Sequence, residues 1–247
     1  MNFEASDRIK FAASVLAAAI LSSGLTLGLY KVGGGLAARA GNAITVTGTA
    51  SENATADNAV WSLNLNESQK TLASSVNKID TSADALKKYL ITGGITEDQI
   101  ELGPINSNAI MEFINGNQTG RILGYQAYRT VTVRTKDVKL VSKLSNDIGS
   151  LLATGVNVGN YVPAYYLSTL DTMRAKLLAS AMKDAQDRAK AITEAVGGQV
   201  GGLLSVSSGP TQVTTKNSLD RAAGGIYDVS TIEKTVNVTL SASFKTK

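Results

Sequence analysis

Apolar and polar residues alternate in several segments of the chain, which is the pattern of half-buried β-strands. The alternation begins at 44–50 and is regular at 59–66, where Trp61, Leu63 and Leu65 are separated by serine and asparagine. It is clearest near the C terminus, at 236–244. These segments predict strands that each place one face on a core.

A hairpin is expected from two further strands around 105–113 and 122–135, joined by the turn-rich segment 115–120. Arg129 falls on the apolar face of the second strand. Either a bulge re-aims this side chain, or the arginine belongs to an ion pair or an interface. We favour the bulge or a strand edge. Shorter strands are expected within 157–168 and at 203–208.

Three segments have the apolar period of a helix. The first stripe runs from Leu72 to Leu90 and is followed by two glycines, and the second begins at an N-cap, Asp137, and ends at Gly155. The longest helix is expected at 169–196. Its predicted buried side is Leu170, Leu177, Ala181, Ala185, Ala189, Ile192 and Val196. Unequal groups of strands and helices with prominent hairpins predict an α+β fold, with antiparallel sheets and helices packed on one face.

An apolar segment precedes this domain. After a short tail, 1–10, the residues from Phe11 to Tyr30 contain no charge, and about 20 helical residues span the hydrocarbon core of a bilayer. We therefore expect residues 11–31 to contact the lipid bilayer as a transmembrane anchor or signal segment. A glycine-rich linker, 32–42, follows, and 43–247 forms the α+β domain.

The segment 11–31 allows more than one interpretation. A cleaved signal peptide would use Ala38-Arg39-Ala40 before Gly41, but that site lies far beyond the apolar run. The length favours an uncleaved anchor, and a buried helix of a soluble protein fits less well. Either of the first two interpretations exports the domain to the periplasmic or extracytoplasmic side, anchored or soluble.

Composition removes most familiar catalytic chemistry. The 247 residues include no cysteine and no histidine, which excludes disulfides, thiolate or imidazole metal ligands, cysteine nucleophiles and histidine-based triads. The 24 basic residues are interleaved with 20 acidic ones, for a net charge of +4. Such a distribution lacks the basic stripe of a nucleic-acid-binding protein, so we expect no nucleic-acid partner.

Two Ser-x-x-Lys pairs, Ser75 with Lys78 and Ser180 with Lys183, place an amine one helical turn from a hydroxyl, as a Ser/Lys hydrolase requires. The S-D-N and K-T-G motifs that accompany this pair in β-lactamases do not occur in the sequence. Chance matches on polar helical faces explain both pairs better. A hydrolase therefore stays an alternative, and we expect no catalytic residue.

Other polar clusters have simple structural explanations. Glu97 and Asp98 form a tight acidic pair after a glycine turn, where carboxylates more often cap backbone amides than bind a cation. We expect no metal and no cofactor. Tyr161, Tyr165 and Tyr166 cluster near Pro163, and they form either hydrophobic contacts at the start of the long helix or the patch of a ligand-binding or partner-binding module.

Several stretches resemble the SIMPL domain family. They are ITVTGTASENATAD at the start of the domain, ALKKYLITGGITEDQI at 85–100, GYQAYRTVTVRTKDV at 124–138, the alanine-rich segment 175–207 and the terminal TVNVTLSASF. The resemblance covers almost all of 43–247. It implies an α+β fold in the periplasm or cell envelope, no established catalytic residues, large hollow homo-oligomers in some members, and a link to stress tolerance.

Together these observations predict a non-enzymatic, membrane-anchored envelope protein whose domain associates with copies of itself. Unpaired strand edges, the hairpin tip at 114–124 and the irregular excursion at 209–230 are the expected contact regions, since exposed strand amides pair readily with other chains.

Overall fold

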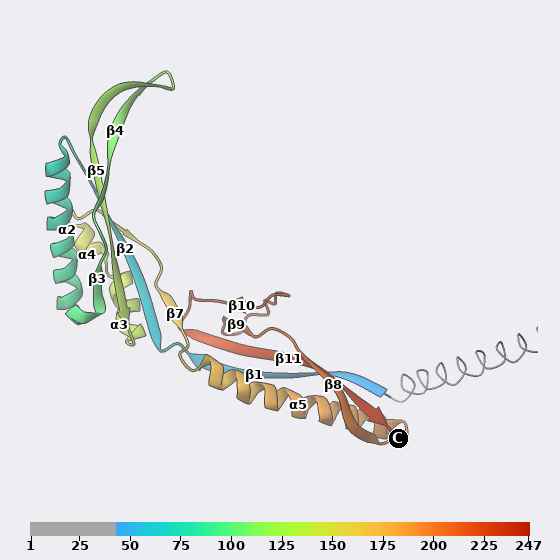
Figure 1. Ribbon diagram of the computed structural model, residues 1–247. Helices are drawn as coiled ribbons and strands as arrows, with labels where there is room; N and C mark the ends of the chain where they lie inside the picture. The colour runs from blue at the N-terminus through green and yellow to red at the C-terminus, as the bar shows by residue number, and fades with distance from the viewer. Residues whose placement is uncertain (1–42) are drawn as a thin grey trace, which may run out of the picture. The chain divides into compact units, whose positions relative to one another are not determined.

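The structure, a computed structural model, describes residues 43–247 (Figure 1). In that part of the chain four helices accompany two mostly antiparallel sheets, which confirms the α+β class. The predicted tail, anchor and linker, 1–42, lie outside the described residues. None of the helices described is long and apolar enough to cross a membrane.

The described part of the chain divides into two compact units. The larger unit contains residues 50–180 and 209–239, and the smaller unit contains 43–49, 181–208 and 240–247. Three elements, β1 (Ala43–Thr55), α5 (Leu170–Ala195) and β11 (Glu233–Thr246), have residues in both units.

A six-stranded sheet in the larger unit has β2 (Asn58–Gln69) and β5 (Asn117–Thr135) at its centre. These two strands pair without a register shift from Ala59 opposite Thr135 to Gln69 opposite Tyr125. The flanking strands are β3 (Ile100–Leu102) and β4 (Asn106–Ile114) on β5, and β6 (Val158–Asn160) and β7 (Ala164–Tyr166) on β2.

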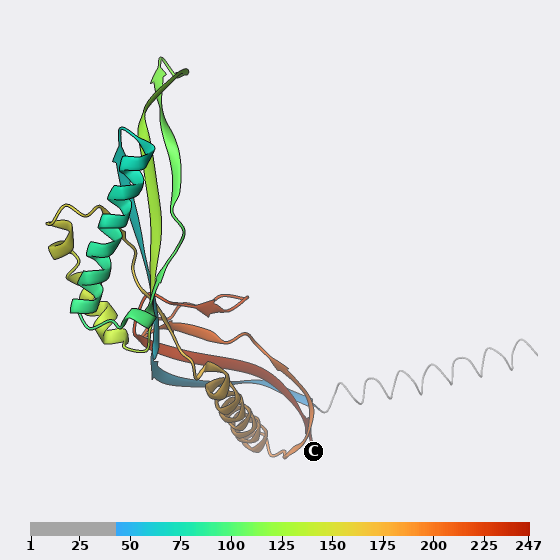
Figure 2. The ribbon, with the colours of Figure 1, turned by 60° about the vertical axis from the view of Figure 1, so that its left-hand side comes forward.

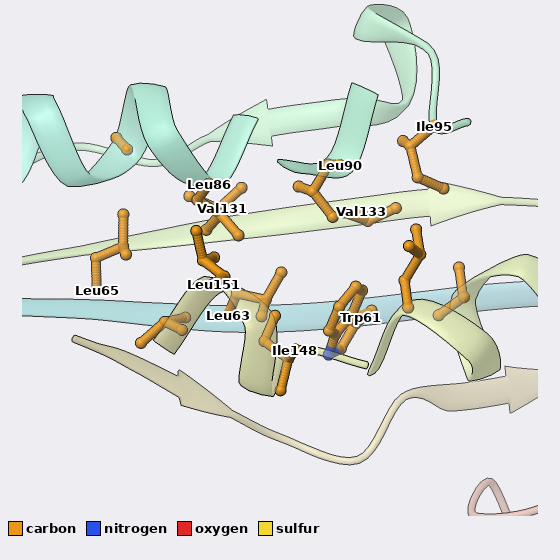
Figure 3. Packing of buried hydrophobic residues seen from close by; sticks show 14 of the residues in the cluster. Trp61, Leu63, Leu65, Leu86, Leu90, Ile95, Val131, Val133, Ile148 and Leu151 are labelled. Carbon is orange, nitrogen blue, oxygen red and sulfur yellow. The ribbon is translucent and has the colours of Figure 1, made fainter. Parts of the chain in front are cut away.

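The core of the larger unit lies between this sheet and its helices (Figure 3). Alternate residues of β2 and β5 are buried, as their period-two pattern predicts, and they include Trp61, Leu63 and Val131. Leu86 and Leu90 of α2 (Leu72–Thr92) pack against them. The glycines that follow end α2 where expected, with the Gly93 N–H bonded to the Tyr89 carbonyl at 2.9 Å.

Two helices depart from the predicted pattern. On α2, Leu72 is exposed, whereas Ser75 and Ser82 are buried, because their hydroxyls have partners on other elements. The single helix expected from Asp137 to Gly155 is two: α3 (Val138–Asn146) and α4 (Gly149–Leu152). Asp137 does cap α3, since its Oδ1 accepts from the Leu140 N–H at 2.9 Å.

In the smaller unit, alanines allow a close approach between α5 and β1. Ala181, Ala185 and Ala189 are fully buried, and a Cβ added to Gly48 would lie 2.0 Å from the Ala181 carbonyl oxygen. The same unit pairs β8 (Val200–Ser208) with the end of β11. The prediction that Ile192 and Val196 are buried is wrong: both are exposed, and Thr193 is buried, with its hydroxyl donating to the Ala189 carbonyl.

The excursion at 209–230 has limited regular structure. It contains β9 (Gln212–Thr215) and the two-residue β10 (Ile226–Tyr227), which pair in parallel. Gln212 holds the loop between them, because its Nε2 donates to the Ala222 carbonyl at 2.8 Å. The segment is therefore an ordered loop with a short strand at each end.

Candidate functional site

The far half of the β4–β5 hairpin forms an arm, which we define as residues 110–124. In Figures 1 and 2 the arm continues past α2, and no other described element of the larger unit lies beside it. The connection at its tip is tighter than expected. Only Asn115 and Gly116 lie between the strands, with positive φ angles of 49° and 83°, so β5 begins at Asn117 instead of near 122. Asn-Gly suits a two-residue hairpin turn because both residues tolerate positive φ.

The arm exposes large apolar side chains. Phe113 is 64% exposed and Ile114 is 56% exposed, and about half of Ile122 and Leu123 is exposed as well. The pairing of β4 with β5 shifts register twice within the arm, between Ile110 and Met111 and again before Phe113. Such bulges re-aim neighbouring side chains, and several large apolar side chains exposed on one short segment indicate an interaction region.

Polar contacts hold the two strands of the arm together. Arg121 forms an ion pair with Glu112 at 3.2 Å, and the Thr119 hydroxyl donates to the other Glu112 carboxylate oxygen at 2.8 Å. Their value for stability is small, because Arg121 is well exposed and screened by solvent. They nevertheless keep the two strands aligned without a covering layer.

Gly124 marks the point where the arm leaves the packed sheet. A Cβ at this position would lie 2.7 Å from the Gln69 carbonyl oxygen at the end of β2. Only glycine permits this approach without a backbone shift. Tyr125, the residue after Gly124, forms the last β2–β5 pair, opposite Gln69, so the pairing with β2 does not extend into the rest of the arm.

The two Ser-x-x-Lys pairs have no arrangement typical of a nucleophile. Ser75 is fully buried, and its hydroxyl donates toward the Tyr125 carbonyl at 2.7 Å and the Thr71 carbonyl at 3.2 Å. Ser180 is exposed and donates to the Lys176 carbonyl at 3.1 Å. A serine nucleophile must instead pass its proton to a base, and neither hydroxyl is bonded to Lys78 or Lys183.

The three tyrosines near Pro163 do not form one patch. Tyr165 is buried, Tyr161 is exposed, and Tyr166 contacts Tyr227 with ring centroids 6.1 Å apart. A cavity of about 510 Å³ borders Tyr161, Pro163 and Tyr165. Trp61 lies beneath this segment and fixes it, because its Nε1 donates to Asn160 Oδ1 at 3.0 Å.

Of the acidic pair Glu97 and Asp98, Glu97 has a structural role. Glu97 lies in a short 3-10 helix and forms an ion pair with Lys87 of α2. Throughout 43–247, no group of three or more potential metal-ligating residues comes together.

Lys234 is a buried polar residue that the sequence analysis missed. Its side chain is inaccessible to solvent, and its Nζ donates to the Asp228 carbonyl at 2.6 Å. Burial lowers the pKa of Lys234, and the nearby Asp228 carboxylate opposes part of that shift. The sequence contained a signal for this burial. Lys234 lies two residues before Val236 and therefore on the same buried face of β11 as Val236 and Val238. The bond ties the end of the excursion to β11.

The fold is thus that of an α+β protein with an exposed apolar arm. The model of the SIMPL family, described as a protein of unknown function (DUF541), matches residues 44–244, so the chain belongs to the SIMPL family. The resemblance found in the sequence is confirmed. The comparison with curated proteins finds no significant match.

Solved structures offer only distant likenesses. The de novo designed protein Foldit4 is 13% identical, with a TM-score of 0.19, over 42% of this chain and 93% of its own. A hydantoinase/carbamoylase family amidase from Burkholderia ambifaria is 14% identical, with a TM-score of 0.24, over 45% of this chain and 30% of the enzyme. Its counterpart from Burkholderia vietnamiensis is 11% identical, with a TM-score of 0.22, over 47% and 30%. Likenesses this weak carry no information on activity.

Proposed function

We propose that this SIMPL protein is a non-enzymatic envelope protein, anchored through residues 11–31, whose domain assembles with copies of itself through the arm. The exposed apolar surface at Phe113, Ile114, Ile122 and Leu123 is the observation that carries this proposal. Leaving such side chains in water is unfavourable, and burial recovers about 25 cal/mol per Å² of apolar surface. A link to envelope stress is the wider role that the family resemblance suggests.

The occupant proposed for the arm is a second copy of this chain. In the described part of the chain, β4 pairs with β5 alone, so its outer edge offers unpaired backbone groups next to the apolar side chains of the arm. One intermolecular contact can cover both. Strand edges pair with strands, and identical chains supply identical edges in a closed symmetric assembly.

Export of the domain rests on the sequence of the apolar segment. About 20 uncharged residues match the hydrocarbon thickness, and the short tail before them carries Arg8 and Lys10. In this arrangement the arm and the excursion work outside the cytoplasmic membrane, on the periplasmic or extracytoplasmic side.

The test is the mass distribution of the full chain extracted in detergent. Mass photometry or native mass spectrometry at micromolar concentration should find assemblies larger than a monomer. The double variant Phe113→Ser with Ile114→Ser should shift them toward monomers, since it removes the two most exposed apolar side chains of the arm.

Val196→Ser is the matched control. Val196 is 82% exposed but belongs to the smaller unit, so this change removes an exposed apolar side chain elsewhere and should leave the masses unaltered. Monomers of the unmodified protein, or an equal loss of assembly in both variants, would refute the role of the arm.

A further inference from the structure

Part of the face of the six-stranded sheet opposite its core carries uncharged polar side chains. Because successive strand residues point to opposite faces, the positions between the buried residues of β2 and β5 face away from α2. Among them are Asn64 and Asn66 on β2, directly opposite Thr130 and Tyr128 on β5. These residues border a hollow of about 510 Å³, a volume typical of small-ligand sites.

The amide groups in this hollow are already oriented. Asn64 Oδ1 accepts from the Thr130 hydroxyl at 2.8 Å, and Asn66 Oδ1 accepts from Gln126 Nε2 at 2.9 Å. Asn157 Nδ2 donates to the Asn66 carbonyl at 2.8 Å. Each of these hydrogen bonds uses either the oxygen or the nitrogen of an asparagine side chain, and not both. Within residues 43–247, the Nδ2 groups of Asn64 and Asn66 have no protein partner and can donate to a ligand.

Two tyrosine rings and one glycine shape the opening. Tyr128 and Tyr161 both line the hollow and are well exposed. Gly159 of β6 lies opposite Asn64, where a Cβ would meet only ordinary contacts, the nearest at 3.5 Å. The backbone at Gly159 would accept a side chain, and the hollow is open because glycine has none. The negative face of a tyrosine ring attracts the slightly positive C–H groups of a flat ligand.

The charge around the hollow selects against ionic ligands. Arg129 is the charged residue of its lining, and that guanidinium is already engaged on the core side, with Asp80 Oδ1 at 3.1 Å and the Gly103 carbonyl at 2.8 Å. A phosphate or nucleic-acid ligand would need free cations to offset its charge. The available groups instead suit a neutral ligand that both donates and accepts hydrogen bonds.

We propose that this hollow binds a short stretch of a neutral oligosaccharide. A sugar ring presents vicinal hydroxyls that donate and accept at once, which matches the amide and hydroxyl groups of Asn64, Asn66 and Thr130. Its C–H face matches the rings of Tyr128 and Tyr161. This site is independent of the proposed self-association, because it uses the sheet face and not the arm.

Calorimetric titration of the full chain with cellotetraose, chitotetraose and maltotetraose tests the proposal. The detergent must have a zwitterionic headgroup, because a maltoside or glucoside would itself present sugar. At least one tetrasaccharide should bind saturably, with a Kd below about 1 mM. Failure of all three to saturate by about 10 mM would overturn the proposal.

Variants locate the binding. Gly159→Leu fills the hollow without removing any hydrogen bond, and Asn64→Ala removes a donor, so each should weaken binding about tenfold or more. Tyr128→Ala should do the same, whereas Tyr128→Phe keeps the ring and should bind within about threefold of the parent protein. Asn108→Ala, on an exposed position of β4 outside the lining, is the matched control and should change nothing.

Two further results would contradict the site. Unchanged affinity in Gly159→Leu would place the sugar elsewhere. A Gly159→Leu protein that loses its assemblies, from a parent that binds no sugar, would identify this face as a subunit contact. The double arm variant Phe113→Ser with Ile114→Ser should keep its sugar affinity, which separates this site from the proposed self-association.

Discussion

Both halves of β5 carry apolar side chains, but their surroundings are opposite. In the half paired with β2, Ala127, Val131 and Val133 are fully buried beneath α2. In the arm half, Ile122 and Leu123 face solvent. The difference arises at Gly124, where β2 ends and the pairing with β4 becomes irregular. The sequence of a strand therefore indicates which residues favour burial. Whether they are buried within the same chain depends on whether another element, such as α2, packs on that face.

The largest effect is expected from the packed half. Leu86→Ala removes a fully buried side chain of α2 that covers β5, and the lost burial plus the cavity should lower the free energy of unfolding by about 2–5 kcal/mol. Phe113→Ala in the arm removes a larger side chain but should change it by no more than about 0.5 kcal/mol. Urea unfolding followed by circular dichroism measures both. Equal losses would show that the two halves do not differ in packing.

An intermediate effect is expected at the boundary. Gly124→Val places a branched side chain against the Gln69 carbonyl, and the backbone shift should cost about 1–3 kcal/mol of unfolding free energy. Gly149→Ala is the control, since a Cβ there meets nothing within 4 Å. Urea unfolding of both proteins gives the comparison, and a neutral Gly124→Val would mean that the boundary is not set by this close approach.

A smaller effect on stability is expected at Arg129, the charged residue on the otherwise apolar face of the packed half. Arg129 forms an ion pair with Asp80, which was the alternative explanation of its position. The bulge, one half of the favoured explanation of a bulge or a strand edge, is absent, because β5 keeps its register with β2 here. A double-mutant cycle of Arg129→Met and Asp80→Ala should give a coupling energy of about 0.2–1 kcal/mol that falls as salt is added. A coupling energy of zero at low salt would remove the ion pair from this account.

The smallest effect on global stability is expected at the arm tip. Asn115→Val puts a β-branched residue at a positive φ of 49°, which strains the turn. Trypsin should cut faster after the exposed Arg121, while the unfolding free energy changes by less than about 0.5 kcal/mol. A large global loss would mean that the arm and the packed half unfold together.

The spacing of apolar residues predicted the strands and helices that bury one face and expose the other. The strands β2 and β11, the helix α2 and the Asp137 cap all follow from residues near each other in sequence. The predicted hairpin was also found, although Asn-Gly alone forms its turn. These features depend on residue spacing and turn chemistry, which a single sequence contains.

Other features depend on partners far away in sequence. Ser82 is buried because its hydroxyl donates to Glu67 at 2.6 Å, and Lys234 is buried because it bonds to the Asp228 carbonyl. From sequence alone, polar residues of this kind are predicted to be exposed, because their hydrogen-bond partners are not known. The hollow beside Asn64 was missed for the same reason, since Tyr128 and Tyr161 come together only through strand pairing with β2.

We propose above all that another copy of this chain covers the arm. A photo-crosslinking amino acid at position 113 of the full chain, irradiated in the membrane and in detergent, tests it most directly, with the same label at Val196 as the control. Self-association through the arm predicts crosslinked dimers and higher multiples from position 113 alone, with peptide mapping that joins the arm to this same sequence. Adducts confined to lipid or to other proteins, or an equal yield from Val196, would contradict it.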